Sequence, residues 1–223
     1  MNRVEQIESR RRFLKQASLA ALAFPLLINC KSDALAQKSE NELLSRIKIN
    51  ALPASAEGMG AIDVPDNVSW KTVLAKKSER DEPMIISGTV YQADGKTPAP
   101  GVLIYFYHTD SEGIYGRGNG EHKHGHFRGW MLTDTKGRYE ISSIKPTSYP
   151  NRTFAAHIHM TLTGKNFKED WIDSILFEGD RFISAQERNQ AGRKGGFNPI
   201  LKLEKGADGS LRGTRDIQLL WKV

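Results

Sequence analysis

The nine residues FAAHIHMTL, Phe154–Leu162, decide the fold class of this chain. Alternate residues of a β-strand share a face, so the apolar residues from Phe154 to Leu162 line one face and form a core surface. The other face carries His157 and His159, which lie close enough at positions i and i+2 to bind one ion. The same pattern also fits a half-exposed strand whose histidines only form hydrogen bonds. Further ligands elsewhere in the chain must decide between these interpretations.

Runs of similar β-forming character lie on both sides of this strand, separated by turns rich in Gly, Pro and Asp. They are MIISGTVYQ (84–92), VLIYFYHTD (102–110), GWMLTDTKGRYEIS (129–142), DSILFE (173–178) and TRDIQLL (214–220). No periodic helix longer than a couple of turns is expected. The spacing therefore predicts an all-β fold, an antiparallel β-sandwich of the immunoglobulin or transthyretin-like kind.

Length and composition support one folded domain with a flexible arm. The chain has 223 residues, of which 39% are hydrophobic, enough for one substantial core. Residues 37–80 are polar and contain Pro53 and Pro65, so we expect an extended N-terminal arm that lies over the domain. The β-sandwich domain itself is expected over residues 81–223.

The first 36 residues have the features of a signal peptide. SRRRFLK (9–15) precedes a short apolar run over 17–28, which Pro25 interrupts and which is too short to span a bilayer as a helix. SRRRFLK resembles the twin-arginine translocation motif. That resemblance implies export of the folded, cofactor-loaded protein by the twin-arginine machinery. We therefore expect a periplasmic or other extracytoplasmic location.

Two cleavage sites remain open for this signal peptide. Ala34 and Ala36 form a small-x-small site before Gln37, whereas LINC, ending at Cys30, resembles a lipoprotein box and would give a membrane-anchored lipoprotein. Cys30 is the only cysteine in the chain. The domain that follows therefore contains neither disulfides nor thiolate metal ligands.

The positive charge of the chain comes partly from the signal peptide. The chain has 32 basic and 26 acidic residues. Residues 1–36 hold six of the basic residues and three of the acidic ones. The remaining residues are only slightly basic, with 26 basic and 23 acidic side chains, and no basic run is interleaved with aromatic residues. This composition predicts a solvated surface of mixed charge and gives no support to nucleic-acid binding.

Two tyrosines at predicted loop positions are candidate partners for the histidine pair. Tyr115 lies in EGIYG after one strand, and Tyr149 lies in KPTSYP just before His157 and His159. A deprotonated phenol is a hard, anionic oxygen donor, so two phenolates with two imidazoles suit ferric iron better than zinc or copper(I). The ion itself would lower the pKa of each phenol.

At this point the sequence resembles the intradiol ring-cleavage dioxygenases, of the protocatechuate 3,4-dioxygenase type. The matching pieces, in order over roughly residues 80–180, are IISGTVYQADGKTPAPGVLIYFYHTDSEGIYG, LTDTKGRYEISSIKPTSYP, AHIHM and ILFEGD. The resemblance implies a non-haem Fe(III) site with the ligands Tyr115, Tyr149, His157 and His159, of which Tyr149 and His159 are axial. It also implies a catechol-type substrate, cleaved by O2 between its two hydroxyl-bearing carbons. Whether the protein forms a homo-oligomer stays open. In this chemistry Tyr149 is displaced by the substrate and accepts one of its protons.

Two positions depart from the family pattern. Phe154 stands where the family usually has an arginine that stabilises substrate charge, and Arg152, two residues earlier, is the candidate catalytic replacement. Ser174 stands where a pocket glutamine is common. The replacement of the usual arginine by Phe154 predicts a preference for less acidic, bulkier catechols over protocatechuate.

Other histidines and acidic residues have less specific interpretations. His122, His124 and His126 fit a surface loop near the pocket mouth better than a second metal site. A cupin site is excluded because no glutamate follows His159 within a few residues. Phe127 and Trp130 are expected to pack, and Glu178 and Asp180 to form turn hydrogen bonds. The alternative function is a non-catalytic, transthyretin-like β-sandwich binding module.

Overall fold

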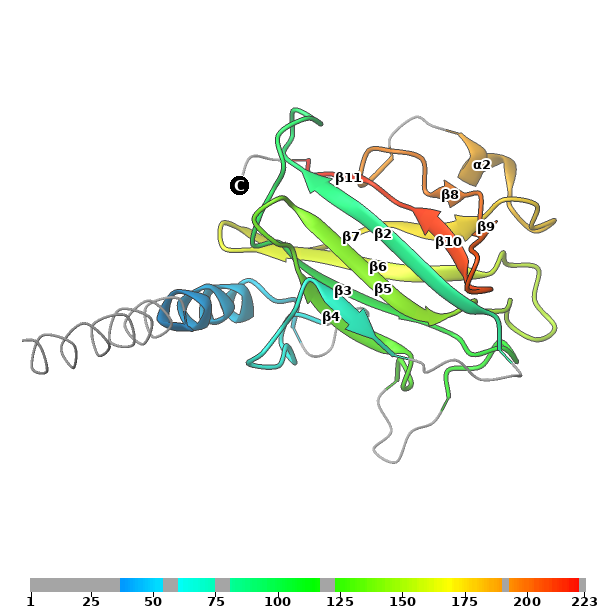
Figure 1. The fold of residues 1–223 in the computed structure, drawn as a ribbon, viewed down its shortest axis with the longest axis horizontal. Helices are drawn as coiled ribbons and strands as arrows, with labels where there is room; N and C mark the ends of the chain where they lie inside the picture. The colour runs from blue at the N-terminus through cyan, green and yellow to red at the C-terminus, as the bar shows by residue number, and fades with distance from the viewer. Residues whose placement is uncertain (1–36, 54–59, 75–80, 117–122, 190–192, 221–223) are drawn as a thin grey trace, which may run out of the picture. The chain divides into compact units, whose positions relative to one another are not determined.

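Alternating apolar side chains build two facing β-sheets (Figure 1). The computed structural model describes residues 37–53, 60–74, 81–116, 123–189 and 193–220, so the signal peptide, both cleavage sites and Cys30 lie outside the described residues. The chain divides into two units, residues 1–43 and 44–223. The described residues of the first unit, 37–43, are helical, and all of the strands belong to the second unit. In the described part of the chain, no helix is both long and apolar enough to cross a membrane.

Besides the end of the N-terminal helix at residues 44–49, the described part of the second unit contains eleven strands and the short helix α2. They are β1 (Lys71–Val73), β2 (Pro83–Tyr91), β3 (Leu103–His108), β4 (Arg128–Leu132), β5 (Arg138–Ile144), β6 (His157–Gly164), β7 (Phe167–Phe177), α2 (Ala185–Arg188), β8 (Ile200–Leu201), β9 (Glu204–Lys205), β10 (Leu211–Thr214) and β11 (Ile217–Gln218). Strand β6 covers most of the stretch that first indicated a strand. The predicted all-β sandwich is confirmed.

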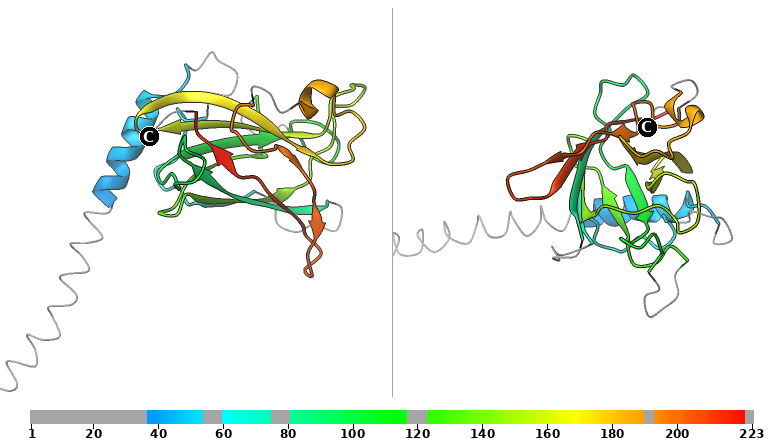
Figure 2. Two further views of the ribbon diagram at one scale, coloured as in Figure 1. Left: turned by 90° about the horizontal axis from the view of Figure 1, so that it is seen from above. Right: turned by 90° about the vertical axis from the view of Figure 1, so that its right-hand side faces the viewer.

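One sheet has the order β1-β5-β2-β10-β9, with β11 also paired to β2, and the other has the order β4-β3-β6-β7-β8. The long central pairs β2–β5, β3–β4, β3–β6 and β6–β7 are antiparallel, as predicted. The pairs β1–β5, β2–β10, β2–β11 and β7–β8 are parallel, so both sheets are mixed. Figure 2 shows the two layers edge-on. The parallel pairs join segments far apart in the sequence, which short-range patterns do not reveal.

The inner faces of both sheets supply one hydrophobic core. Met84 and Ile86 of β2 pack in the same cluster as Phe106 of β3 and Ile158 and Met160 of β6, and all five are fully buried. Strand β3 is buried at every residue. Its inward residues enter the core, and its outward residues lie beneath the segments that cover the sheet's outer face.

The N-terminal segment is more regular than predicted. Residues 37–49 are helical, although no helix longer than a couple of turns was expected. In the second unit this helix buries Leu44 and Ile47, which stand three residues apart and so share one helical face. Strand β1, also within the predicted arm, pairs with β5. The prediction of an extended arm over 37–80 is therefore wrong for the helical residues.

The segment after the helix is held against the outer face of the β3-containing sheet. Glu169 of β7 is buried, and its carboxylate accepts hydrogen bonds from the backbone N–H groups of Leu52, Gly60 and Ala61, at 3.0, 3.0 and 3.2 Å. A Cβ atom on Gly60 would lie 1.9 Å from Cγ of Tyr105. Only glycine allows the backbone to pass this close to the tyrosine ring.

A buried histidine makes folding stability depend on pH. Nδ1 of His108 donates to the carbonyl of Thr109 and Nε2 accepts from the hydroxyl of Ser143, at 2.7 and 2.9 Å. Burial lowers the pKa of His108 from 6.5 to about 4, against the raising effect of the Thr109 hydrogen bond. Between these values the unfolded state binds a proton that the folded state does not, so stability falls as pH falls from 6.5 to 4.

We expect this histidine to contribute roughly 3 kcal/mol to that fall in stability. In the variant His108→Asn, the free energy of unfolding, measured by urea titration at several pH values, should lose this contribution to its pH dependence. The exposed His126 provides the control, since His126→Asn should keep the slope. An unchanged slope in His108→Asn would contradict the prediction.

Candidate metal centre

The structure brings together the four side chains that the sequence predicted as metal ligands. His157 and His159 begin β6, Tyr149 lies in the loop before it, and Tyr115 lies in the loop after β3. The two phenol oxygens lie 2.6 Å apart, and the oxygen of Tyr149 lies 3.2 Å from Nε2 of His157. Nε2 of His157 lies 2.9 Å from Nε2 of His159. Four donor atoms from three segments therefore meet at one place.

The far side of each imidazole is held by a neighbouring group. Nδ1 of His157 donates a hydrogen bond to the carbonyl of Ala155, at 2.7 Å. In the neutral ring this leaves the lone pair of Nε2 directed at the other donor atoms. Nδ1 of His159 lies 3.3 Å from the hydroxyl of Ser174. A carbonyl or hydroxyl behind the ring is the usual arrangement for a metal-binding histidine.

The protonation states of the cluster favour a bound cation. Burial lowers the pKa of His159 to about 3, with smaller effects from His157 and His124, so its imidazole is neutral at neutral pH. Burial raises the pKa of Tyr115, as does the hydrogen bond with Tyr149. The phenol of Tyr115 therefore keeps its proton unless a nearby cation stabilises the phenolate. A hard, highly charged cation such as Fe(III) fits this donor set.

The tyrosine oxygens are needed to complete any metal site here. Among the described residues, no group of three or more His, Cys, Asp or Glu side chains is placed to hold a metal ion. The histidine pair alone would provide two donors. Tyr115 and Tyr149 add two more, and the four together make a donor set of mixed nitrogen and oxygen.

We call Tyr115, Tyr149, His157 and His159 the tetrad. A cavity of about 540 Å³ opens over it. Three of the four tetrad residues line it, together with Tyr107, Lys123, His124 and Trp171. The ring of Tyr107 stacks on His159 and on His124, with ring centroids 4.6 and 3.7 Å apart. Aromatic rings thus form much of the wall, which suits a flat aromatic ligand.

His124 is a residue of this cavity that the sequence reasoning missed. The surface-loop interpretation is wrong for His124, which is only 5% exposed and shares a 2.7 Å hydrogen bond with the hydroxyl of Tyr105. His126 is exposed and lies 3.2 Å from the carbonyl of Gly116, and His122 lies outside the described residues. The local sequence around His124 does not indicate burial, because the residue that covers it, Tyr105, comes from β3.

The remaining predicted residues have distinct places. Arg152 is exposed and does not line the cavity over the tetrad, so the structure does not bring it to the tetrad. Phe154 is 58% exposed, with its ring 6.3 Å from that of Tyr149. Asp180 accepts hydrogen bonds from the N–H groups of Ala156 and Phe182, as expected for a turn residue.

Trp130 and Phe127 are packing residues, as predicted. The indole N–H of Trp130 donates to the carbonyl of Gly60 at 2.6 Å, and Phe127 stacks on His108. Neither residue lines the cavity over the tetrad. Trp130 therefore supports the segment that covers the outer face of the sheet, whereas Phe127 packs beside His108, which bonds to Ser143 of the facing sheet.

Comparison with known proteins places the chain in a family. A family model described as dioxygenase matches residues 66–214. The chain is 28% identical over 103 residues to catechol 1,2-dioxygenase of Acinetobacter baylyi, covering 45% of this chain and 33% of the relative. It is 27% identical over 139 residues to the protocatechuate 3,4-dioxygenase beta chain of Burkholderia cepacia, covering 58% of this chain and 57% of the relative.

Solved structures show the same fold. The dioxygenase domain of a carbohydrate-binding fusion protein from Streptomyces sp. SirexAA-E matches with a TM-score of 0.53 at 24% identity, covering 76% of this chain and 97% of that one. The 3-chlorocatechol 1,2-dioxygenase of Rhodococcus opacus 1CP matches with a TM-score of 0.56 at 21% identity, covering 78% and 72%. The chain spans less than two thirds of the length of either curated relative. The family match covers most of the chain, which therefore belongs to the intradiol ring-cleavage dioxygenase family.

Proposed function

We propose that this protein is an exported, non-haem Fe(III) dioxygenase that cleaves a catechol-type ring between its two hydroxyl-bearing carbons with O2. The convergence of the two phenol oxygens and the two Nε2 atoms carries this proposal. Tyr115, Tyr149, His157 and His159 would hold the ion. When bound, the ferric ion supplies the Lewis-acid and electron-accepting chemistry that opens the ring to O2.

The chain's own residues orient the substrate and accept its protons. The phenol oxygen of Tyr149 lies between the Tyr115 oxygen and Nε2 of His157, and Tyr149 lines the cavity, so as a phenolate it can accept a proton from a catechol hydroxyl. Its 2.6 Å hydrogen bond with Tyr115 holds the two phenol oxygens next to each other. Tyr107 and Trp171 flank the bound ring with their aromatic faces and limit the access of water.

The first test is the metal content of the purified protein. We expect about one ferric ion per chain and a broad visible tyrosinate-to-iron charge-transfer band. The variant His157→Ala should lose both, because His157 would remain a ligand throughout the reaction, whereas Tyr149 is the ligand that the substrate displaces. His126→Ala is the matched control, since this histidine is exposed and lies outside the tetrad. Zinc, or no metal, in protein matured under iron-replete conditions would overturn the proposal.

A turnover assay on the iron-loaded protein separates the enzyme from the alternative, a binding module on a transthyretin-like sandwich. A binding module does not require two loop tyrosines whose oxygens meet a histidine pair at 2.6 and 3.2 Å. Bound ferric iron without turnover of any catechol would favour the binding module. The geometry of the tetrad favours the enzyme.

Export is the second part of the proposal, supported by SRRRFLK at residues 9–15. Changing both Arg10 and Arg11 to lysine should leave unprocessed precursor in the cytoplasm, because the twin-arginine machinery reads this pair. Arg12→Lys, next to the pair, should be processed normally. Normal processing of the double variant would indicate the general secretory route. Mass spectrometry of the mature N-terminus distinguishes a lipidated Cys30 from a free Gln37.

A further inference from the structure

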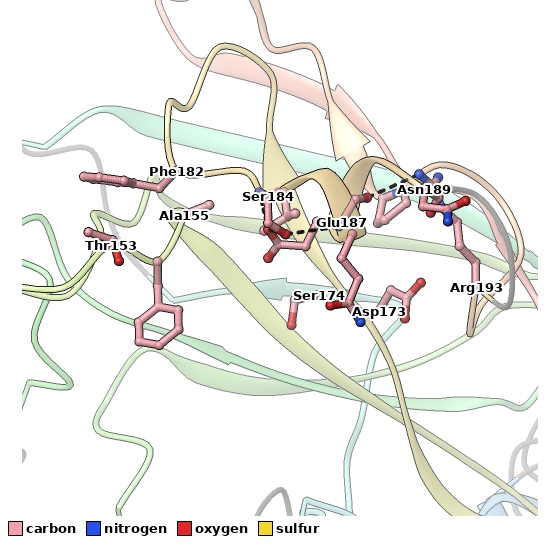
Figure 3. A pocket seen from close by; sticks show the side chains of 13 residues that line it. Thr153, Ala155, Asp173, Ser174, Phe182, Ser184, Glu187, Asn189 and Arg193 are labelled. Atoms are coloured by element: carbon pink, nitrogen blue, oxygen red, sulfur yellow. Dashed lines mark hydrogen bonds between the residues drawn. The ribbon is translucent and has the colours of Figure 1, made fainter.

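A second cavity of about 540 Å³ lies beside the tetrad, between β7 and the segment that carries α2 (Figure 3). Thr153, Ala155 and Phe182 lie at one end of it, and Asn189 and Arg193 lie at the other. The cavity over the tetrad already provides room for a single ring. The proposed reaction at the tetrad gives this second cavity, the flanking cavity, no role.

The flanking cavity shares its wall with the metal centre. Ala155, whose carbonyl holds His157, and Ser174, whose hydroxyl lies 3.3 Å from Nδ1 of His159, both line it. Phe154 also lines it, and its ring packs edge-on against that of Tyr149. Phe154 therefore lies between the flanking cavity and Tyr149, which lines the cavity over the tetrad.

The two ends of the flanking cavity differ in chemistry. Phe182 lies at one end, and Phe154, whose ring packs against that of Tyr149, also lines the cavity. The other end presents the polar side chains of Asn189 and Arg193. A volume of this size lies in the range of roughly 300–1,000 Å³ that is typical of sites for drug-sized ligands. The cavity thus suits an apolar group near the ring and oxygen atoms farther away.

The charged groups of the flanking cavity do not favour an anion. The guanidinium of Arg193 already donates to neutral oxygens, with contacts of 2.7 Å to the side chain of Asn198 and 3.2 Å to the carbonyl of Asn189. Two carboxylates, Asp173 and Glu187, line the same cavity. A carboxylate on the ligand would meet these two like charges and a cation whose hydrogens are engaged.

We propose that the substrate is a catechol with an extended, uncharged and oxygen-bearing substituent, and that the flanking cavity binds this substituent. The inference rests on the proposed ring cleavage at the tetrad and names the class of substrate for it. Phe154 and Phe182 contact the apolar part of the substituent, and the polar far end binds its hydroxyl or ether oxygens. Simple catechol leaves the flanking cavity empty.

A matched pair of substrates tests the charge preference. With iron-loaded protein, kcat/KM for 4-(3-hydroxypropyl)catechol should exceed that for 3-(3,4-dihydroxyphenyl)propanoate and that for catechol, each by about tenfold. The first two compounds have side chains of the same length and differ at the terminal group. An equal or higher value for the acid would overturn the assignment of an uncharged substituent.

A cavity-filling variant tests the location. Gln186 of α2 lines the flanking cavity, whereas Arg188 of the same helix does not. In Gln186→Trp the ratio of kcat/KM for the hydroxypropyl compound to that for catechol should fall about tenfold, because the indole occupies the cavity. Arg188→Trp should leave this ratio unchanged. An unchanged ratio in Gln186→Trp would overturn the location.

Binding of an inert analogue separates this inference from the proposed reaction. 3-(3,4-Dimethoxyphenyl)propan-1-ol has the same side chain but no acidic hydroxyls, so it cannot be cleaved as a catechol. Calorimetry should show that it binds the purified wild-type protein and binds Gln186→Trp about tenfold more weakly. Binding without any catechol turnover would reject the reaction and keep the cavity assignment. Turnover of catechol with no binding of the analogue would reject the cavity assignment alone.

Discussion

Changing Tyr149 to phenylalanine should lower the turnover of a catechol about 100-fold to 10,000-fold while most of the iron stays bound. The change removes the oxygen that accepts a substrate proton, and a correctly placed proton acceptor is typically worth that factor. The other three donor side chains remain. His157 and His159 lie at the start of β6, and Tyr115 lies in the loop after β3. Oxygen uptake and iron analysis on the same preparation measure the two effects.

The control for this variant is Tyr91→Phe. Tyr91 packs against Phe197, with ring centroids 5.8 Å apart, and lies outside the cavity over the tetrad. It should keep both iron and turnover. Equal losses of iron and activity in Tyr149→Phe would show that this tyrosine is only a structural ligand. Extradiol products from the wild-type protein would contradict the mechanism itself.

Changing Glu169 to alanine should lower the free energy of unfolding by about 3 kcal/mol or more. The buried carboxylate accepts from three backbone N–H groups of the 52–61 segment and, at 2.7 Å, from the hydroxyl of Thr161. Each buried donor left without a partner costs about 1–3 kcal/mol. The midpoint and slope of urea unfolding measure the loss.

Glu204→Ala is the matched control, because this glutamate is exposed on β9 and its change should cost less than about 0.5 kcal/mol. Glu169→Gln should lie between the two, since its amide keeps one acceptor oxygen but turns an NH2 group toward backbone donors. A loss below 1 kcal/mol in Glu169→Ala would show that the segment is held by other contacts.

The sequence by itself determined the fold class and the candidate ligands. The alternation in FAAHIHMTL predicted one core face and one polar face, and β6 carries both. The prediction is wrong for Phe154, which lies before the strand begins and is exposed. Tyr115 and Tyr149 were recognisable because a phenol in a loop has no packing reason to be there. These features are readable because strand alternation is a local property of the backbone and the ligand types are chemically restricted.

Other features of the site required the tertiary structure. Glu169 binds Gly60, 109 residues earlier, and Ser174 lies behind His159 because β7 pairs with β6. His124 became a cavity residue only through Tyr105 of β3, 19 residues before it.

The physical reason is that the local sequence determines which face of a strand a side chain occupies. The residues that this face contacts come from strands and covering segments that are distant in the sequence. The parallel partners of β2, namely β10 and β11, come from the C-terminal end of the chain, more than 110 residues away from β2. Such contacts form only when the chain closes long loops, and their free energy depends on the whole assembled core. The tetrad could therefore be predicted from the sequence. The flanking cavity, lined by β7 and the segment that carries α2, exists only because the fold brings these two segments together.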